Sequence, residues 1–459
     1  MSPLWTANEI AEATGGTVQG EFDVAGATFD SREVGPGDLF IAMKGEATDG
    51  HRFLDQAFAA GASGALVSEA IAQPHVHVPD VNVALNNLAW ASRDRCQGKV
   101  IGVTGSVGKT GAKEALWAAL DRSAPGRAHR SVKSYNNHTG VPLSLARMPR
   151  ATKYGVFEMG MNHAGELAAL TRIVRPHVAI VTTIAPAHRE FFPDDEAIAD
   201  AKGEIFQGLE PGGTAIIPWD SPHRDRLIAA ARPCAANIVT FGHGEGADVR
   251  ASYVVRGPKG GSLITAQLPS ATLSFTLAPP GEHWVANALA VLAAVEAVGG
   301  DLAAAGLALA DLGGLKGRGE RHLVPVAGGA ALLIDESYNA NPASMAATIK
   351  VLGDEKIEGR RIAILGSMRE LGPDSDDFHR ALAARLEAAG VDYAILVGRE
   401  MEALAKALGD QVKMAHVPDA ASALPLARAA IGPGDALLVK GSNAIGLAAL
   451  VEALAAGTD

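Results

Sequence analysis

The stretch TGSVGKTGAKEAL, residues 104–116, decides the fold, because it follows an apolar run and opens a helical pattern. The run KVIGV at 99–103 predicts a strand, TGSVG a turn of small residues, and the residues from Lys109 onward a helix. Backbone N–H groups of such a turn and the positive end of the helix cradle phosphate, while Lys109 reaches the terminal phosphates and the Thr110 hydroxyl can bind magnesium. The stretch therefore predicts a nucleotide site on an α/β fold.

The loop departs from the usual phosphate-binding signature at Val103, where that signature has its first glycine. The departure shortens the loop without removing the cradle of small residues. A glycine-rich turn that holds no ligand is the alternative. The residues expected to contact the phosphates are Gly105, Ser106, Val107, Gly108, Lys109 and Thr110.

Length and composition indicate a large globular protein. A chain of 459 residues predicts roughly three domains of about 150 residues each. Only Cys96 and Cys234 are present, which favours a reducing compartment over a disulfide framework. No signal-peptide pattern and no apolar run of ~20 residues occur, so we expect a cytoplasmic protein without membrane insertion.

The formal net charge is −11, from 40 Lys and Arg against 51 Asp and Glu. Nucleic-acid binding requires a dense basic surface that displaces counterions from the phosphate backbone. The charge therefore argues against a nucleic-acid partner, and a phosphate ligand must be held locally.

Strand and helix patterns divide the chain into three α/β regions. We expect a small N-terminal domain at 1–82 and a central domain at 83–315 with a phosphate-binding loop. A Rossmann-like domain should follow at 316–459. Alternating strands and helices in the central region predict a parallel sheet with helices on both faces. The glycine-rich stretch DLGGLKGRGERH, 311–322, is typical of a linker.

Polar residues at the carboxyl ends of strands are candidates to complete the site, because ligands of open α/β sheets bind there. Glu158 ends the apolar run YGVFE and requires a partner or a metal if it is buried, although a surface cap is the alternative. His188 follows the run HVAIVTTIA and is either a ligand or an ordinary hydrogen-bonded histidine. Lys202 lies near the start of a helical pattern and is most simply a solvated surface residue.

The loop SYNNHTGVPLSL is dense in amides and hydroxyls and precedes a helix that begins after Gly140. Its residues Asn136, Asn137 and Thr139 either orient a polar substrate or form turns and cap that helix.

Several motifs together resemble the ATP-dependent Mur ligase family of peptidoglycan synthesis, over residues 30 to 442. The family's phosphate loop is short, which accounts for Val103. The motifs are TGSVGKT, YNNHTGVPLSL, FEMGMNHAGEL, AHREFF with AKGEIF, GEHWVANALA, GRGERH and LIDESYNANPASM.

This resemblance implies roles for individual residues. Lys109 and Thr110 would serve ATP and a first magnesium ion, with Glu158 on that metal. His188 would approach a second magnesium, and Lys202 matches the family's carbamylated lysine, whose CO₂ adduct supplies anionic oxygens to metal. The catalytic residues implied are thus Lys109, Lys202 and His188, and the metal ligands Thr110, Glu158, His188 and Lys202.

Further positions match the family's substrate contacts. The segment HWVAN corresponds to the adenine side of ATP, and the linker and the following domain also reach ATP. The segment DSREVGPGDLFIAMKGEATDGHRF resembles the uridine-nucleotide segment. The implied ATP contacts are His283, Asn287, Arg318 and Asp335, and the implied contacts to the uridine nucleotide are Ser31, Arg32, Asp49, Gly50 and His51.

Two sequence features distinguish between members of the family. The chain lacks the Asp-Asn-Pro-Arg motif of the ligases that add the third peptide residue. It has DESYNANPASM and LGSMRELG followed by His379, as in the members that add D-alanyl-D-alanine. A departure is Asn443 in KGSNAIG, where arginine is usual. The implied substrates are UDP-N-acetylmuramoyl tripeptide, D-alanyl-D-alanine and ATP with Mg²⁺. The resemblance also implies that the reaction passes through an acyl phosphate, and we expect the protein to be a monomer.

Two alternatives remain at this point. One is a Mur-type amide ligase with another amino acid or a folate-like acceptor. The other is a nucleotide-gated binding protein that forms no bond.

Overall fold

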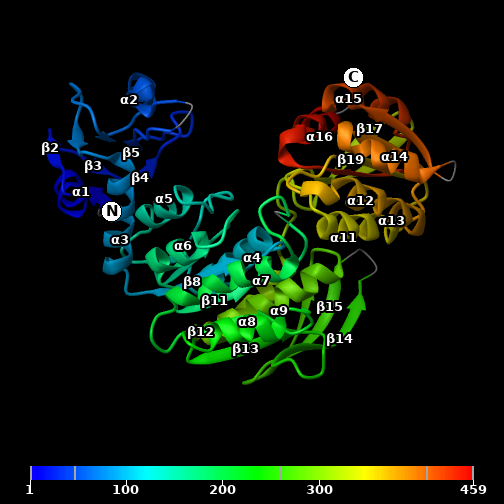
Figure 1. Cartoon of the computed structure of the whole chain (residues 1–459), viewed down its shortest axis with the longest axis horizontal. Helices are drawn as coiled ribbons and strands as arrows, with labels where there is room; N and C mark the ends of the chain where they lie inside the picture. The colour runs from blue at the N-terminus through cyan, green and yellow to red at the C-terminus, as the bar shows by residue number, and fades with distance from the viewer. Residues whose placement is uncertain (1–2, 46–47, 188, 258–260, 410–411, 457–459) are drawn as a thin grey trace.

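Three large sheets, each covered by helices, form three domains in the computed structural model of the chain (Figure 1). The structure describes residues 3–45, 48–187, 189–257, 261–409 and 412–456. The N-terminal and C-terminal domains lie on either side of the central one, and the expected α/β class is confirmed. Within the described ranges, no helix is both long and apolar enough to cross a membrane.

The N-terminal domain is built on a five-stranded sheet of order β2-β7-β6-β5-β4, parallel except where β2 meets β7. A capping box formed by Thr6 and Glu9 starts helix α1, and Asp80 caps α3 with a side chain that accepts two backbone N–H groups. Its elements are β1 Trp5–Thr6, α1 Ala7–Thr14, β2 Thr17–Gln19, β3 Asp23–Val24, β4 Gly26–Thr28, β5 Asp38–Ile41, η1 Gly50–Phe53, α2 Leu54–Ala59, β6 Gly64–Val67, β7 His75–His77 and α3 Val81–Arg95.

The central domain carries a nine-stranded sheet of order β16-β15-β14-β13-β12-β11-β8-β10-β9. The strands from β9 to β14 pair in parallel, as predicted. Beyond β14, the strands β15 and β16 form a hairpin that adds two antiparallel strands to this edge of the sheet. Its strands are β8 Lys99–Thr104, β9 Ala128–Arg130, β10 Tyr154–Glu158, β11 Val178–Val181, β12 Thr214–Pro218, β13 Asn237–Gly242, β14 Val249–Arg256, β15 Ser262–Gln267 and β16 Thr272–Leu277.

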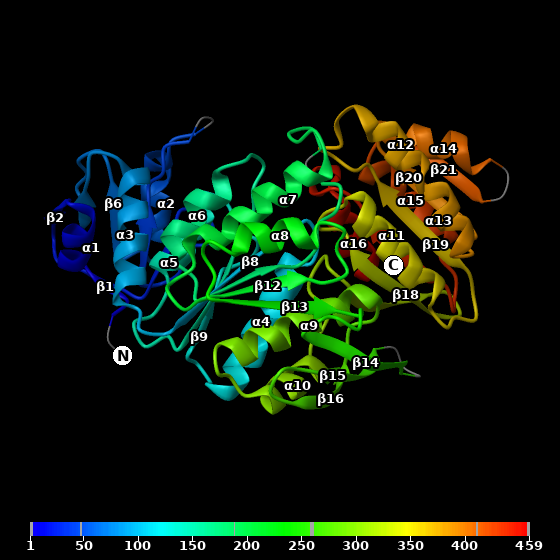
Figure 2. The same cartoon turned by 60° about the horizontal axis from the view of Figure 1, so that its bottom comes forward.

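Helices cover both faces of this sheet, as the alternating pattern predicts (Figure 2). Along β8, Ile101 and Val103 pack with α4 and α9, while Val100 packs with α6 and α7 on the opposite face. The helices are α4 Lys109–Ser123, α5 Gly140–Ala146, α6 Glu166–Val174, α7 Asp195–Gly203, η2 Glu204–Gly208, α8 Arg224–Ala231, α9 Glu282–Ala297 and α10 Leu302–Ala310.

The C-terminal domain has a six-stranded sheet of order β17-β18-β22-β19-β20-β21, parallel apart from its antiparallel edge strand β17. The sheet's two faces are packed by separate apolar clusters, so helices cover both. Its elements are β17 Glu320–Val326, β18 Gly329–Glu336, α11 Pro342–Gly353, β19 Arg361–Gly366, η3 Gly372–Asp374, α12 Ser375–Arg380, α13 Leu382–Ala388, β20 Tyr393–Val397, η4 Arg399–Met401, α14 Glu402–Leu408, β21 Lys413–Val417, α15 Ala420–Ala430, β22 Ala436–Lys440, η5 Asn443–Ile445 and α16 Leu447–Ala455.

Helix α3 joins the first two domains. Its residues Leu85 and Leu88 share an apolar cluster with the N-terminal sheet and with Leu143 of α5. The helix begins at Val81, next to the boundary that we place at residue 82, so the exact division there stays a prediction.

Candidate active site

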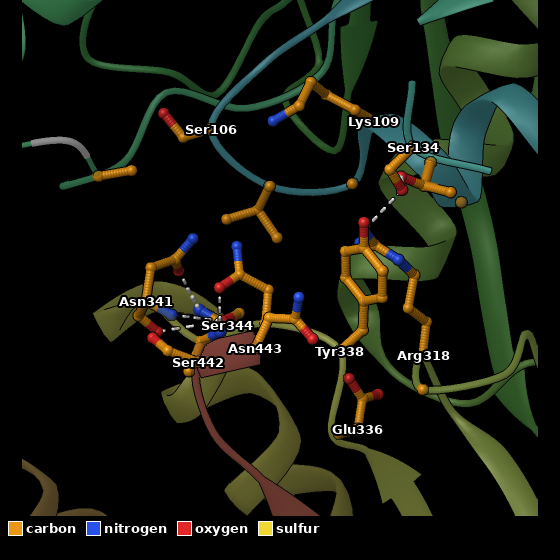
Figure 3. A pocket seen from close by; sticks show the side chains of 18 of the residues that line it. Ser106, Lys109, Ser134, Arg318, Glu336, Tyr338, Asn341, Ser344, Ser442 and Asn443 are labelled. Carbon is orange, nitrogen blue, oxygen red and sulfur yellow. Dashed lines mark hydrogen bonds between the residues drawn. The ribbon is translucent and has the colours of Figure 1, made fainter. Parts of the chain in front are cut away.

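A cavity of about 590 Å³ lies between the central and C-terminal domains, within the size range of small-molecule sites. In Figure 3, Ser106 and Lys109 stand on one side of it, and Asn341, Ser442 and Asn443 on the other. The carboxyl ends of strands from both sheets open into this cavity. Its wall includes the predicted residues Ser106, Val107, Gly108, Lys109, Thr110, Asn136, Glu158, His283, Asn287 and Arg318.

The phosphate loop connects β8 to α4 through two glycines with positive φ, 147° at Gly105 and 88° at Gly108. A Cβ atom at Gly105 would lie 2.0 Å from Thr182 Oγ1, and one at Gly108 would lie 2.7 Å from Asn287 Oδ1. Only glycine therefore fits both positions. Lys109 Nζ donates a 2.6 Å hydrogen bond to the Gly105 carbonyl, and burial lowers the pKa of Lys109 although Glu158 opposes that shift.

Glu158 is buried at the end of β10, which excludes the alternative of a surface cap, and both of its carboxylate oxygens accept hydrogen bonds. Thr110 Oγ1 donates to Oε2 at 2.9 Å, and Asn136 Nδ2 donates to Oε1 at 2.8 Å. A hydroxyl and a carboxylate are the hard oxygen donors that Mg²⁺ prefers. The two side chains fit a magnesium ion beside the phosphate loop.

Lys113, which is not among the site residues predicted from the sequence, lies one turn after Lys109 and is fully buried. Its ammonium donates to the carbonyl oxygens of Ser131 and Lys133 at 3.0 and 2.5 Å, and pairs with Glu114 at 2.9 Å. A lysine four positions after the loop lysine returns to the same helix face, and this spacing could have identified it.

Lys202 lies near the end of α7, not at the start of a helix, and it is fully buried, so the interpretation as a solvated surface residue is wrong. Among the described residues its ammonium has no hydrogen-bond partner. Burial, reinforced by the charge of Lys109, lowers the pKa of Lys202 well below its usual range. His188, the other predicted ligand on this side, lies outside the described residues.

The linker brings Arg318 to the cavity wall. Its guanidinium lies over the Tyr338 ring at 4.1 Å and donates to Ser134 Oγ at 3.3 Å (Figure 3). Asp335 is buried beneath it, where its carboxylate accepts from the backbone N–H groups of Gly317 and Ser337. Asp335 thus orders the linker and is not among the residues that line the cavity.

Glu336 and Lys440 are not among the site residues predicted from the sequence, and they line the cavity at the ends of β18 and β22. Lys440 Nζ lies 3.5 Å from Glu336 Oε2 and donates to the Asn339 carbonyl at 3.0 Å. Burial raises the pKa of Glu336 and lowers that of Lys440. The strand-end rule would have found both residues if it had been applied to the runs ALLIDE and ALLVK.

His283 and Asn287 lie on α9, beside the phosphate loop. Burial lowers the pKa of His283 to about 4, so its ring is neutral near pH 7. Asn287 approaches Gly108, which places this side of the cavity next to the phosphate loop.

The loop residues Asn137 and Thr139 form the turn before α5. Asn137 Oδ1 accepts from the Thr139 hydroxyl at 3.1 Å and from the Gly140 N–H at 2.9 Å, so both residues form the expected turn. Thr139 is the N-cap residue of α5 but its side chain makes no capping hydrogen bond. Their neighbour Asn136 instead points to Glu158.

None of the residues matched to the uridine-nucleotide segment is among those that line the cavity. His51 accepts the Ser68 N–H at Nε2, so its Nδ1–H donates to Asp49 at 2.6 Å. Gly50 abuts the backbone of Met43. The Ser31 hydroxyl donates a hydrogen bond to Gln56 Oε1, and Arg32 forms an ion pair with Asp30 on the surface.

Two C-terminal residues from the motif comparison also have defined places. His379 is buried and accepts the Met368 N–H at Nε2, while its Nδ1–H donates to the Ser375 carbonyl. It supports the loop after β19 and does not line the cavity. Asn443, which stands where arginine is usual, lines the cavity.

Three Mur ligase family models match the chain. The middle domain matches residues 103–295, the glutamate ligase domain residues 317–443, and the family's catalytic domain residues 23–93. A relative from Escherichia coli (strain K12), named UDP-N-acetylmuramoyl-tripeptide--D-alanyl-D-alanine ligase, is 35% identical over 98% of both chains.

Solved structures agree with this match. A MurF structure from Acinetobacter baumannii has a TM-score of 0.84 at 32% identity and covers 98% of this chain and 99% of its own. A MurF ligase from Thermotoga maritima, solved in complex with ADP, has a TM-score of 0.75 at 26% identity and covers 94% of this chain and 97% of its own. Family models, sequence identity over the whole length and fold therefore agree that the chain belongs to the Mur ligase family.

Proposed function

We propose that the chain is an ATP-dependent ligase that joins D-alanyl-D-alanine to UDP-N-acetylmuramoyl tripeptide, with release of ADP and phosphate. The observation that carries the proposal is the cavity in which Lys109, Thr110 and Glu158 of the central domain face the C-terminal domain. Full-length similarity to the Escherichia coli ligase supports the choice of substrates.

The chemistry requires an activated carboxyl group, because oxide is a very poor leaving group. The terminal carboxylate of the tripeptide attacks the γ-phosphorus of ATP, ADP leaves, and an acyl phosphate forms. The amine of D-alanyl-D-alanine then attacks the acyl carbon, loses a proton and expels phosphate. Positioning and electrostatic stabilisation supply the acceleration in such transfers.

The phosphate loop would hold the triphosphate for this attack. Its backbone N–H groups and the Lys109 ammonium neutralise charge on the phosphate oxygens. Mg²⁺, when bound by Thr110 and Glu158, supplies a Lewis acid that draws charge from the transferred phosphoryl group. Asn136 keeps the Glu158 carboxylate oriented through its 2.8 Å hydrogen bond.

Lys202 is proposed to act as a carbamate. A buried ammonium without a partner is costly, whereas a buried neutral amine can add CO₂ and lose a proton. The lowered pKa supports this modification, as does the lack of a hydrogen-bond partner for Lys202 Nζ among the residues that the structure describes. The resulting carbamate would offer oxygen donors close enough to Lys109 for its charge to act on Lys202, and His188 is proposed to serve a second magnesium.

Closure of the C-terminal domain is proposed to complete the site and to exclude water from the acyl phosphate. The linker at 313–319 is the natural hinge, because positive φ angles at Gly317 and Gly319 bend it next to Arg318. Ion pairs already bridge the two domains, namely Glu282 with Lys350, Arg256 with Asp354, and Arg189 with Asp374.

Further parts of the proposal rest on sequence. We place the enzyme in the cytoplasm as a monomer, with domains at 1–82, 83–315 and 316–459. The uridine nucleotide would bind at Ser31, Arg32, Asp49, Gly50 and His51.

The test is phosphate release from ATP, measured with each substrate alone and with both together. The proposal predicts release and a new amide product only when UDP-N-acetylmuramoyl tripeptide and D-alanyl-D-alanine are both present. ATP hydrolysis that is independent of the tripeptide would instead support a nucleotide-gated binding protein. Replacing D-alanyl-D-alanine by single amino acids separates the proposed acceptor from those of other amide ligases.

A further inference from the structure

One short segment of the central domain touches all three domains. Residues 131–137, which we call the bridging loop, follow β9 and lead into α5. Its side chains contact the N-terminal domain through Tyr135, the phosphate-loop helix through Ser134, and the linker to the C-terminal domain through Ser134 as well.

The bridging loop carries two residues of the ATP pocket. Ser134 Oγ lies 3.4 Å from Thr110 Oγ1 and accepts from Arg318 Nη2 at 3.3 Å. Asn136 Nδ2 holds Glu158 Oε1. A shift of the loop would therefore disturb Thr110, Glu158 and Arg318 together.

The inner side of the loop is held by Lys113. The buried ammonium binds the carbonyl oxygens of Ser131 and Lys133, at opposite ends of a three-residue stretch. Lys133 has a φ of 52°, in the left-handed region that costs a non-glycine residue about 1–2 kcal/mol. Such a conformation persists only where the surroundings enforce it.

The outer side of the loop is held by Glu33 of the N-terminal domain. Tyr135 Oη lies 3.2 and 3.3 Å from its two carboxylate oxygens, and Lys133 Nζ forms an ion pair with the same carboxylate. The Glu33 side chain is 23% exposed, so water screens it only in part. Burial and the Glu33 charge both raise the pKa of Tyr135, which keeps its hydroxyl protonated as a donor.

Glu33 follows directly after Ser31 and Arg32, which match the uridine-nucleotide segment. One carboxylate thus connects the segment proposed to bind the sugar nucleotide with the loop that orders the phosphate and metal side chains. Lys133 is clamped at both ends, its carbonyl by Lys113 and its ammonium by Glu33.

We propose that Glu33 is a positioning residue that ties the N-terminal domain to the ATP pocket through Lys133 and Tyr135 of the bridging loop. Its link to the sugar nucleotide rests on the proposed function. The clamp itself, meaning the contacts of Glu33 with Lys133 and Tyr135, does not depend on that function.

The test compares Glu33→Ala with Arg150→Ala. Arg150 forms an ion pair with Glu9 between the same two domains, and its side chain is 48% exposed, but it does not touch the bridging loop. We expect Glu33→Ala to lower kcat about tenfold and to weaken binding of a non-hydrolysable Mg-ATP analogue several-fold. Arg150→Ala should leave both unchanged.

Conservative variants separate positioning from stability. Glu33→Gln keeps one acceptor oxygen for the Tyr135 hydroxyl and should recover part of the affinity for the analogue at an unaltered melting temperature. Binding of the analogue should also tighten when UDP-N-acetylmuramoyl tripeptide is added to the wild type, and this coupling should be lost in Glu33→Ala.

Two outcomes distinguish failure of this inference from failure of the proposed function. If the wild type makes the amide product while Glu33→Ala matches Arg150→Ala in kcat and in analogue affinity, Glu33 is not a positioning residue. If the wild type makes no product but Glu33→Ala still weakens analogue binding, the clamp stands and the assigned reaction is wrong. A rise in KM for the sugar nucleotide alone, with kcat and analogue affinity intact, would also overturn the inference.

Discussion

Thr110 Oγ1 and Glu158 Oε2 are joined by a 2.9 Å hydrogen bond between the first turn of α4 and the carboxyl end of β10. The bond sets a hydroxyl beside a buried carboxylate at the mouth of the phosphate loop. Thr110 and Glu158 are far apart in the sequence, and the parallel pairing of β10 with β8 brings them together. The two side chains fit the proposed magnesium ion beside the phosphate loop.

Glu158→Gln tests this arrangement. Glutamine keeps the shape and can still accept from Thr110, but it removes the charge that would bind Mg²⁺. We expect the Mg²⁺ concentration for half-maximal activity to rise at least tenfold, about 1.4 kcal/mol in metal affinity. Some thermal stability should also be lost, because the buried Lys113 ammonium lies 3.9 Å from Glu158 Oε2. Glu296→Gln, which lies outside the cavity lining, serves as the control. An unchanged Mg²⁺ titration would exclude Glu158 as a ligand.

Gly108→Ala should abolish ATP binding. The added Cβ would lie 2.7 Å from Asn287 Oδ1 in a backbone with a φ of 88°. Gly126→Ala is a matched control, because Gly126 also has a positive φ but no atom within 4 Å of the added Cβ. The control should show only the strain of about 1–2 kcal/mol, whereas equal nucleotide affinity in both variants, measured by calorimetry, would argue against the loop as the ATP site.

Lys202→Ala should be almost inactive and should regain part of its activity with added formate or acetate. A small carboxylate can enter the space left by the side chain and supply the oxygens of the proposed carbamate. Activity is measured against carboxylate concentration, with chloride at equal ionic strength as the control. Absence of rescue would leave the carbamate without support, and full activity without any additive would refute it.

Stability should fall as the pH drops from neutral toward 4, in part because of His177. Burial, with Lys99 and Arg93 nearby, lowers the pKa of His177 to about 4 from 6.5. The unfolded chain therefore binds a proton in this window that the folded chain does not, which favours unfolding as the pH falls. His177 Nδ1 accepts the Val100 N–H at 3.1 Å, and Asn can replace that acceptor.

The free energy of unfolding of His177→Asn should accordingly fall less between pH 6.5 and 4 than that of the wild type. The difference in slope corresponds to about one proton, which the unfolded wild-type chain binds at His177 and the variant cannot. Denaturant midpoints of wild type and variant at several pH values measure this difference. Part of the slope should remain in the variant, because burial also lowers the pKa of His129 to about 4. Parallel pH profiles for the two proteins would contradict the assignment.

The phosphate-loop side of the site could be predicted because it depends on local order. A strand, a glycine turn and a helix fix Lys109 and Thr110, and the end of the next apolar strand fixes Glu158. The resemblance to the Mur ligases gave Arg318 its place at the cavity, although no local pattern shows that it reaches Ser134.

Other features depend on contacts between distant segments. The burial of Lys202 cannot be inferred from AKGEIF, because a charged residue in a helical pattern is normally exposed. The antiparallel strands β15 and β16 break the strand and helix alternation that revealed the rest of the sheet. Asp335 lies beneath the cavity wall because two backbone N–H groups of the linker region bind it, and local sequence does not show this.

The most direct test of the account follows oxygen from the tripeptide to phosphate. UDP-N-acetylmuramoyl tripeptide labelled with ¹⁸O in its terminal carboxylate is incubated with ATP, Mg²⁺ and D-alanyl-D-alanine, and the released phosphate is analysed by mass spectrometry. Formation of an acyl phosphate predicts one ¹⁸O atom in each phosphate and one in each amide product. Unlabelled phosphate would show that water cleaves ATP and would contradict the ligase mechanism.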